Sequence, residues 1–192
     1  MINRFFVIAT LILASSLAVN WILDESEEPA RETARNDPDL YMLNAAINQF
    51  GNDGRLQHTL SAQRFTHFPL TDLTTLQSPH IRLRPDNVSS PWEIEADEGR
   101  LLSESLYREE IVELWDNVLA NQTISGAEFV QIQTESLTVY PGREYLETDR
   151  KVYIDNQTGQ TTAAGMKAFL DSGRFQFFSD GNERVMTIFL PD

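Results

Sequence analysis

Four carboxylates stand close together in the segment PWEIEADEGRL at 91–101, namely Glu93, Glu95, Asp97 and Glu98. Carboxylates at this density can bind a hard cation such as Ca²⁺. They can also act as a general acid and base, provided that one of them lies in a low-dielectric cleft that raises its pKa. The element that carries the four acids decides whether either chemistry is available.

The apolar residues of the same segment alternate with the acids, which predicts a β-strand. Successive side chains of a strand point to opposite faces, so Trp92, Ile94 and Ala96 would share one face and the acids the other. A row of carboxylates in water lacks the desolvation that raises a catalytic pKa. The Ca²⁺-loop pattern D-x-[DN]-x-[DN]-G is missing as well. We interpret the acids as the solvated face of a strand, with metal binding and catalysis as the alternatives.

Other catalytic and metal-binding patterns are missing from the sequence. The three histidines, His58, His67 and His80, belong to no HExxH or HxH pair, and the chain has no cysteine. No GxSxG, Walker loop or GxGxxG occurs either. We therefore expect no enzyme, no metal site and no cofactor.

Length and charge narrow the class of protein. The 192 residues, 41% of them hydrophobic, suffice for one domain plus a tail or anchor. The net charge of −14 argues against a nucleic-acid partner, because binding phosphates requires clustered Lys and Arg.

The N-terminal segment predicts a membrane anchor. Residues 5–23, FFVIATLILASSLAVNWIL, carry no charge and would span roughly 28 Å as a helix, close to the thickness of a bilayer core. Arg4 precedes the run and acids follow it, so residues 1–4 are expected in the cytoplasm and the rest outside. The alternative is a cleaved signal peptide ending at Ser16-Leu17-Ala18, but the apolar run continues through Leu23.

A linker and a single β domain follow. Residues 24–39 are polar and acidic and are expected to form a flexible linker. From residue 40 to 192 short alternating runs are separated by turn signals, beginning with GNDG at 51–54, which predicts a hairpin. We expect an all-β fold, in which residues 99–114 could form one helical turn.

A weak internal repeat underlies the predicted domain. Each of four units places a small residue, Ala62, Ala96, Thr134 or Gly165, a few positions before an apolar one. The apolar residues in question are Phe65, Leu101, Leu137 and Phe169. Near-equal spacing favours hairpins stacked into two sheets, although any β-meander is faintly repetitive.

In such a stack one face of every strand points between the sheets. The residues expected there are Ala45, Ile47, Leu60, Ala62, Leu76, Ile81, Leu83, Trp92, Ile94, Ala96, Val118, Ile132, Val139, Val152, Ile154 and Met166. They would form a dry core if the sheets close and a long apolar groove if the sheets splay.

The order of several segments resembles one known family. These segments are DPD at 37–39, FGNDGRLQHTLSAQRFTHFP at 50–69, SPHIRL at 78–83, PWEIEADEGRL at 91–101, LWDNV at 114–118, TESLTVYP at 134–141, TDRKVYI at 148–154 and GMKAFL at 165–170. With the N-terminal anchor and the acidic linker, they resemble the LptC family across essentially the whole chain. That family is the bitopic inner-membrane component of the lipopolysaccharide export bridge of Gram-negative bacteria.

The resemblance implies a twisted, open β-jellyroll of the OstA/LptA-like type that holds acyl chains between two antiparallel sheets. The implied function is to receive lipopolysaccharide from an inner-membrane ABC transporter and to pass it to a periplasmic bridge protein. A structural adaptor without direct lipid contact is the alternative.

The resemblance also implies assembly through edge strands. An N-terminal edge with Ala45, Ile47 and Phe50, together with the transmembrane helix, would meet LptB/LptF/LptG-like transporter subunits. A C-terminal edge at 185–190, with Val185, Thr187 and Phe189, would meet an LptA-like protein.

Overall fold

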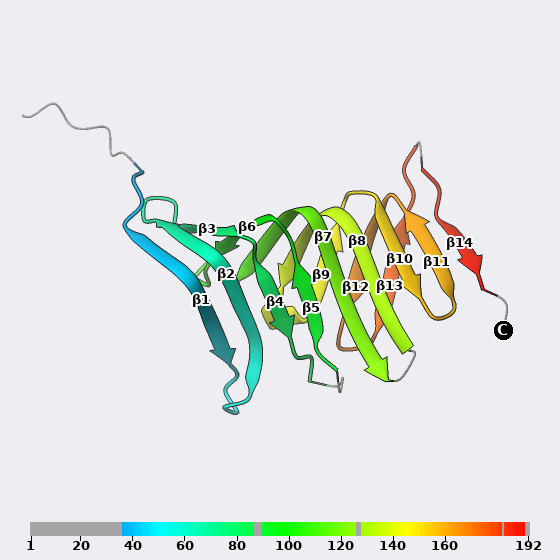
Figure 1. The fold of residues 1–192 in the computed structure, drawn as a ribbon, viewed down its shortest axis with the longest axis horizontal. Helices are drawn as coiled ribbons and strands as arrows, with labels where there is room; N and C mark the ends of the chain where they lie inside the picture. Colours follow the sequence, from blue (N-terminus) through cyan, green and yellow to red (C-terminus); the bar gives the residue numbers. More distant parts are fainter. Residues whose placement is uncertain (1–35, 87–89, 126–127, 182, 191–192) are drawn as a thin grey trace, which may run out of the picture. The chain divides into compact units, whose positions relative to one another are not determined.

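The described part of the chain consists almost wholly of antiparallel strands (Figure 1). The computed structural model describes residues 36–86, 90–125, 128–181 and 183–190. The predicted anchor at 5–23 and the linker up to residue 35 lie outside these ranges. Within them, no helix is long and apolar enough to span a membrane.

The strands confirm the all-β prediction. In chain order they are β1 Leu40–Phe50, β2 Leu56–Phe68, β3 Leu73–Gln77, β4 His80–Leu83, β5 Trp92–Glu95, β6 Glu98–Leu102, β7 Ile111–Ser125, β8 Glu128–Tyr140, β9 Tyr145–Thr148, β10 Val152–Asn156, β11 Gly159–Ala163, β12 Gly165–Phe169, β13 Arg174–Phe178 and β14 Met186–Phe189. A 3₁₀ helix, η1 Pro141–Arg143, is the only helical segment in the described ranges. The helical turn considered within 99–114 is wrong, because β6 and β7 occupy the two ends of that segment and a β-bridge between Ser105 and Arg108 lies between them.

The long strands change partners halfway along their length. The first half of β2 pairs with β4 and the second half with β3. Strand β7 pairs with β6 and then with β5, and β8 pairs with β10 and then with β9. A single hydrogen-bonded sheet of 14 strands is therefore folded into two layers that share their long strands. We call the layer with β4, β5, β10, β11 and β14 layer A, and the layer with β3, β6, β9, β12 and β13 layer B (Figure 1).

The line along which the sheet folds, which we call the corner, is held by backbone hydrogen bonds between successive strands. The amide of Ser78 donates to the carbonyl of Asp97 over 2.7 Å, and the amide of Asp97 donates to the carbonyl of Asp116 over 3.0 Å. Ser78, Asp116 and Asn117 have φ values of 49°, 62° and 57°, in the left-handed region. In β7 this conformation inserts one extra residue opposite β8, a β-bulge that bends the strand.

The small residues of the predicted repeat all lie at this corner. Ala62 and Ala96 are buried where β2 and the β5–β6 connection pass from one layer to the other. Thr134 is also buried, and its hydroxyl donates to the carbonyl of Lys151. At Gly165 an added Cβ would stand 2.8 Å from the carbonyl oxygen of Thr148. The corner therefore requires small side chains, because the two layers approach most closely there.

Candidate functional site

The space between the two layers holds the residues that were predicted to line it. All are buried except Ala45 and Ile47, which pack half-buried against the same hydrophobic cluster. In this structure the interior is filled by the chain's own side chains. Most of the predicted residues come from layer A and the corner; Leu76, Val139 and Met166 represent layer B.

The prediction missed most of the interior face of layer B. The additional buried residues are Phe65, Leu101, Val112, Leu114, Leu137, Leu146, Ala168 and Leu170. Three of these, Phe65, Leu101 and Leu137, are the apolar residues of the repeat, and their periodic position was the available signal. The fourth, Phe169, is only half-buried and makes a tilted ring contact with Tyr145, with ring centroids 5.1 Å apart.

The interior side of a strand changes sequence parity at the corner. In β2 the buried positions are even up to Ala62 and then include Phe65. In β8 they are Ile132 and Thr134, followed by Leu137 and Val139. A single alternation extended along these strands therefore assigns one half of each to the wrong face.

Trp92 joins the layers in the interior. Its side chain is 2% exposed, and its ring lies 6.4 Å from the ring of Phe175, centroid to centroid. Trp92 belongs to β5 of layer A and Phe175 to β13 of layer B. Tilted aromatic contacts of this kind add to the burial of apolar surface.

Polar side chains bridge the layers at the mouth, the side opposite the corner. Buried His58 of β2 lies with its Nε2 2.8 Å from Oε1 of Glu110, just before β7. The amide of Asp86 donates to Oε1 of Glu144 over 2.9 Å. Burial raises the pKa of the Glu144 carboxyl, and the backbone hydrogen bond from Asp86 opposes that rise. These contacts are non-covalent, whereas the corner is continuous backbone.

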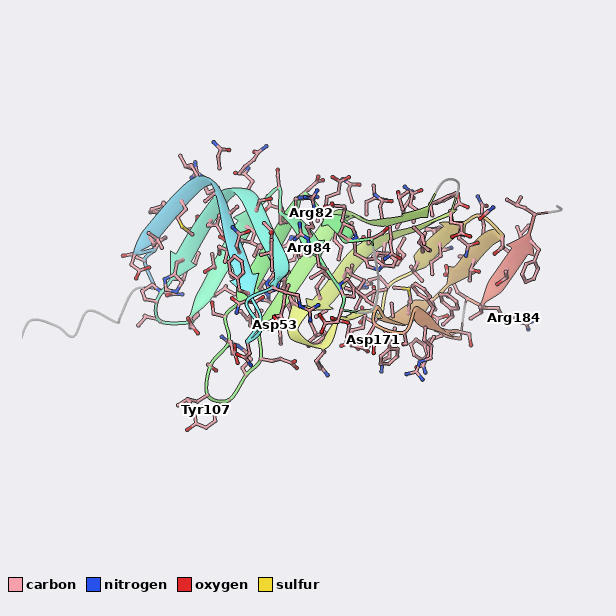
Figure 2. The ribbon with its side chains drawn as sticks, turned by 90° about the horizontal axis from the view of Figure 1, so that it is seen from below. Asp53, Arg82, Arg84, Tyr107, Asp171 and Arg184 are labelled. Atoms are coloured by element: carbon pink, nitrogen blue, oxygen red, sulfur yellow. The ribbon has the colours of Figure 1, made fainter. Side chains whose placement is uncertain are left out.

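A cavity of about 310 Å³ opens at this mouth. Leu83, Arg84 and Asp86 line it from one side, and Arg143, Glu144 and Asp171 from the other, together with Gln57, Pro85, Pro141 and Gly142. Within the described ranges, Nη1 of Arg84 is buried without a hydrogen-bond partner. Arg84 and Asp171 are both labelled in Figure 2. The cavity thus joins an interior apolar residue, Leu83, to charged groups at the surface.

The carboxylates at 93–98 have separate structural roles. Glu93 lies 2.9 Å from Nε2 of His80 and also pairs with Arg82. Asp97 accepts a hydrogen bond of 2.6 Å from Nδ2 of Asn117 at the corner, and Glu95 is exposed. In the part of the chain that the structure describes, no three His, Asp or Glu residues are grouped as metal ligands. Strand β5 ends at Glu95, so the predicted row of acids is interrupted at the corner.

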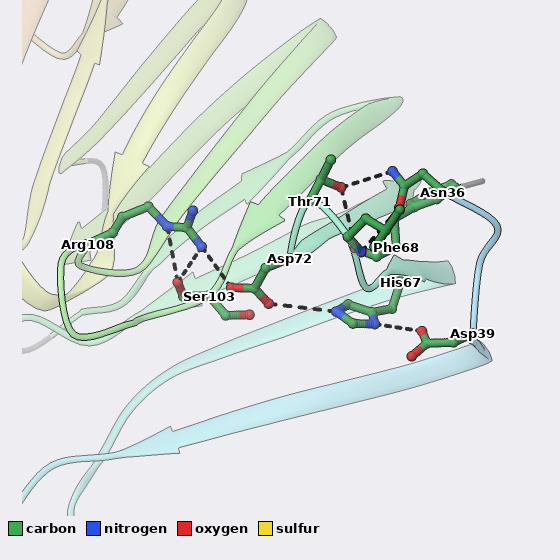
Figure 3. Close-up of polar contacts among 9 residues, drawn as sticks. Asn36, Asp39, His67, Phe68, Thr71, Asp72, Ser103 and Arg108 are labelled. Carbon is green, nitrogen blue, oxygen red and sulfur yellow. Dashed lines mark hydrogen bonds and ion pairs between the residues drawn. The ribbon is translucent and has the colours of Figure 1, made fainter. Parts of the chain in front are cut away.

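The histidines do not converge, since each pairs with a different acid. His67 is the centre of a polar network at the start of β1, which we call the N-terminal clasp (Figure 3). Its Nδ1 lies 2.7 Å from Asp39, and its Nε2 lies 3.7 Å from Asp72. Asp72 in turn pairs with Arg108 over 3.1 Å. The hydrogen bond to Asp39 is the main cause that raises the pKa of His67, and burial opposes it.

Three strands have one unpaired edge within the described ranges, and one of them is β13, which pairs with β12 alone. The other two lie at the ends of the described domain. Strand β1 pairs with β2 alone, and β14 pairs with β11 alone. Phe50 in β1 and Phe189 in β14 are 57% and 76% exposed. Val185, expected in the last strand, precedes β14, which begins at Met186. Free strand edges with exposed apolar side chains can accept a strand from another chain.

Comparison with known proteins agrees with this architecture. LptH, described as the LptA homologous periplasmic component of the conserved lipopolysaccharide transport device from Pseudomonas aeruginosa, aligns with a TM-score of 0.52. The alignment covers 82% of this chain and 98% of that chain at 6% sequence identity, so it shows the fold alone. No curated protein matches the sequence. The model of the LptC family, described as "Lipopolysaccharide-assembly, LptC-related", matches residues 6–182. The chain therefore belongs to the LptC family.

Proposed function

We propose that this chain is a non-enzymatic carrier that holds the acyl chains of lipopolysaccharide between its two layers. The observation that carries the proposal is the shared interior, in which the apolar faces of both layers form one cluster. The cluster extends from Ala45 and Ile47 of β1 to Phe175 and Phe177 of β13. Family membership supports the same function.

The energetics of lipid transfer explain why such an interior is needed. Each buried methylene is worth roughly 0.8 kcal/mol, so an acyl chain of a dozen carbons costs on the order of 10 kcal/mol to expose to water. Burial between two apolar layers removes that cost, while sugars and phosphates stay outside. The net charge of −14 gives little general attraction for the phosphates, so acyl burial supplies the binding free energy.

Acyl chains enter by separation of the layers at the mouth. The corner acts as the hinge because its strands are covalently continuous and hydrogen-bonded. The bridges His58–Glu110 and Asp86–Glu144 open, and so does the Trp92–Phe175 contact. The cavity at the mouth is where this separation begins.

The free edges receive the partners in this proposal. Strand β1, with the predicted anchor at 5–23, meets an inner-membrane ABC transporter with LptB/LptF/LptG-like subunits. Strand β14 meets an LptA-like periplasmic bridge protein. The chain is then a single-pass inner-membrane protein whose described domain is periplasmic.

Photo-crosslinking tests the interior as the lipid site. A photoreactive amino acid at Ile47 or at Ile132 faces the interior, and the adjacent Asn48 or Gln133 faces outward, which provides a matched control. In exporting cells we expect lipopolysaccharide adducts at Ile47 and Ile132 and none at the two controls. Adducts at neither interior position, in chains that still support export, would establish the structural adaptor instead.

A further inference from the structure

The connection between β6 and β7 ends in a tip of two apolar residues. Leu106 and Tyr107 are 94% and 96% exposed. Figure 2 shows Tyr107 at the end of a loop that projects from the rest of the domain. Backbone hydrogen bonds of 2.8 Å and 3.4 Å join Ser105 and Arg108, so Leu106 and Tyr107 are the central residues of a tight turn.

This composition is unusual for a turn. Central turn positions favour Gly, Asn, Asp, Pro and Ser for conformational reasons. Leu106 and Tyr107 supply none of those advantages, and at their exposure they add nothing to the core. Their apolar surface is available to another molecule.

The turn stands on a fixed base. The guanidinium of Arg108 donates to the carbonyl of Ser103 from Nε over 3.2 Å and from Nη2 over 2.9 Å. The same Nη2 donates to Asp72 over 3.1 Å, and Asp72 and Asp39 flank His67 in the N-terminal clasp (Figure 3). Asp39 immediately precedes β1, so the clasp couples the base of the tip to the start of the free edge strand.

We infer that Leu106 and Tyr107 insert into an apolar notch, rimmed by Lys or Arg, on the protein that adds a strand to β1. The inference rests on the N-terminal edge in the proposed function. Glu104, Glu109 and Glu110 flank the tip. Glu109 pairs with Arg143 and Glu110 with His58 at the mouth, so exposed Glu104 is the acid that complements a basic rim. The same acids oppose insertion into an anionic bilayer.

Strand addition alone does not select a partner, and a side-chain contact beside the added strand can supply that selection. Main-chain hydrogen bonds supply affinity with little dependence on sequence, whereas side chains in pockets supply specificity. Tyrosine is enriched among residues that dominate binding free energy. A Leu-Tyr pair held at a fixed place relative to β1 would set the partner and its register.

Paired crosslinkers test the inference in the full-length protein in its own cells. One photoreactive residue replaces Tyr107, and a second, in a separate variant, replaces Leu43, which is 63% exposed in β1. A third replaces Tyr153, 50% exposed in β10, as the control. We expect Tyr107 and Leu43 to capture the same protein and Tyr153 not to capture it.

A double substitution measures the contribution of the tip. The double variant Leu106→Ser, Tyr107→Ser should lower capture of the partner at Leu43 by about tenfold or more when this chain is present at a concentration below saturation. The reason is that residues of this kind supply most of the binding free energy of an interface. Tyr153→Ser should leave that capture unchanged, and neither change should shift the thermal midpoint of the domain.

Each remaining outcome overturns the inference. If Leu43 captures the partner protein while Tyr107 captures only lipid, a second copy of this chain, or nothing, the tip contact is refuted and the N-terminal edge stands. Failure of capture at Leu43 as well refutes the proposed N-terminal edge, and the tip contact with it.

Discussion

Asp97 and Asn117 meet at the corner, where Nδ2 of Asn117 donates to Oδ2 of Asp97 over 2.6 Å. An acid that the sequence displays in a row of carboxylates is thus the partner of a residue in the left-handed region, with a φ of 57°. Asparagine tolerates this conformation better than most residues, and its amide is then free to reach across to the next strand.

Replacing Asn117 tests the corner. Asn117→Val should destabilise the domain by about 1–3 kcal/mol, because a β-branched residue is strained at positive φ. Asn117→Gly keeps the conformation and loses the side-chain bond alone, so it should cost no more than about 1–2 kcal/mol. Urea denaturation measures both, and equal stabilities would contradict the role of the backbone conformation.

Trp92 and Glu95 lie three residues apart in β5 and should differ sharply on substitution. Trp92→Ala removes a buried side chain that contacts the opposite layer and should cost about 3–5 kcal/mol. Glu95→Gln changes an exposed side chain and should stay within about 0.5 kcal/mol. Urea midpoints decide the first effect. Loss of lipopolysaccharide export with the stable Glu95→Gln variant would show that this acid has a functional role we do not assign.

The N-terminal clasp should depend on pH. The pKa of His67 is raised in the folded chain, chiefly by its hydrogen bond to Asp39. Its contribution to stability is therefore fully present below the ordinary histidine pKa of about 6.5 and is lost as the pH rises through the folded value. The difference in unfolding free energy between wild type and His67→Gln should be largest near pH ~5.5 and vanish at alkaline pH. A difference that grows with pH would contradict the ion pair.

Gly159 of β11 lies where the backbone of β14, the C-terminal edge strand, closely approaches β11. A Cβ added there would overlap the backbone carbonyl oxygen of Ile188 in β14. Gly159→Ala should release β14 and raise hydrogen exchange at 186–189, with the core intact because all four residues of β14 are exposed.

The same substitution tests whether β14 is the edge that binds the LptA-like partner in the proposed function. Gly159→Ala should weaken binding of an LptA-like partner by at least about tenfold, since the added strand loses its template. Gly142→Ala is the matched control, because a Cβ there meets nothing within 4 Å. Unchanged partner binding in a chain with β14 released would place that partner elsewhere.

Local patterns in the sequence determined the secondary structure. The hairpin around GNDG is confirmed by β1 and β2, and the alternation at 92–95 is confirmed by the burial of Trp92 and Ile94. The small residues of the repeat proved to mark the corner. These features depend on neighbours a few residues apart, so a single sequence contains them.

Strand pairing between distant segments was decided only in the tertiary structure. β7 pairs with β5 and β6 on one edge and with β8 on the other, and this choice creates the two layers. The bulge at Asp116 and Asn117 and the parity change in β2 and β8 follow from the bend, not from side-chain alternation. The set of predicted interior residues was therefore most complete in layer A. The exposure of Leu106 and Tyr107 could not be predicted from the sequence either. It depends on the position of every other element that could have covered them.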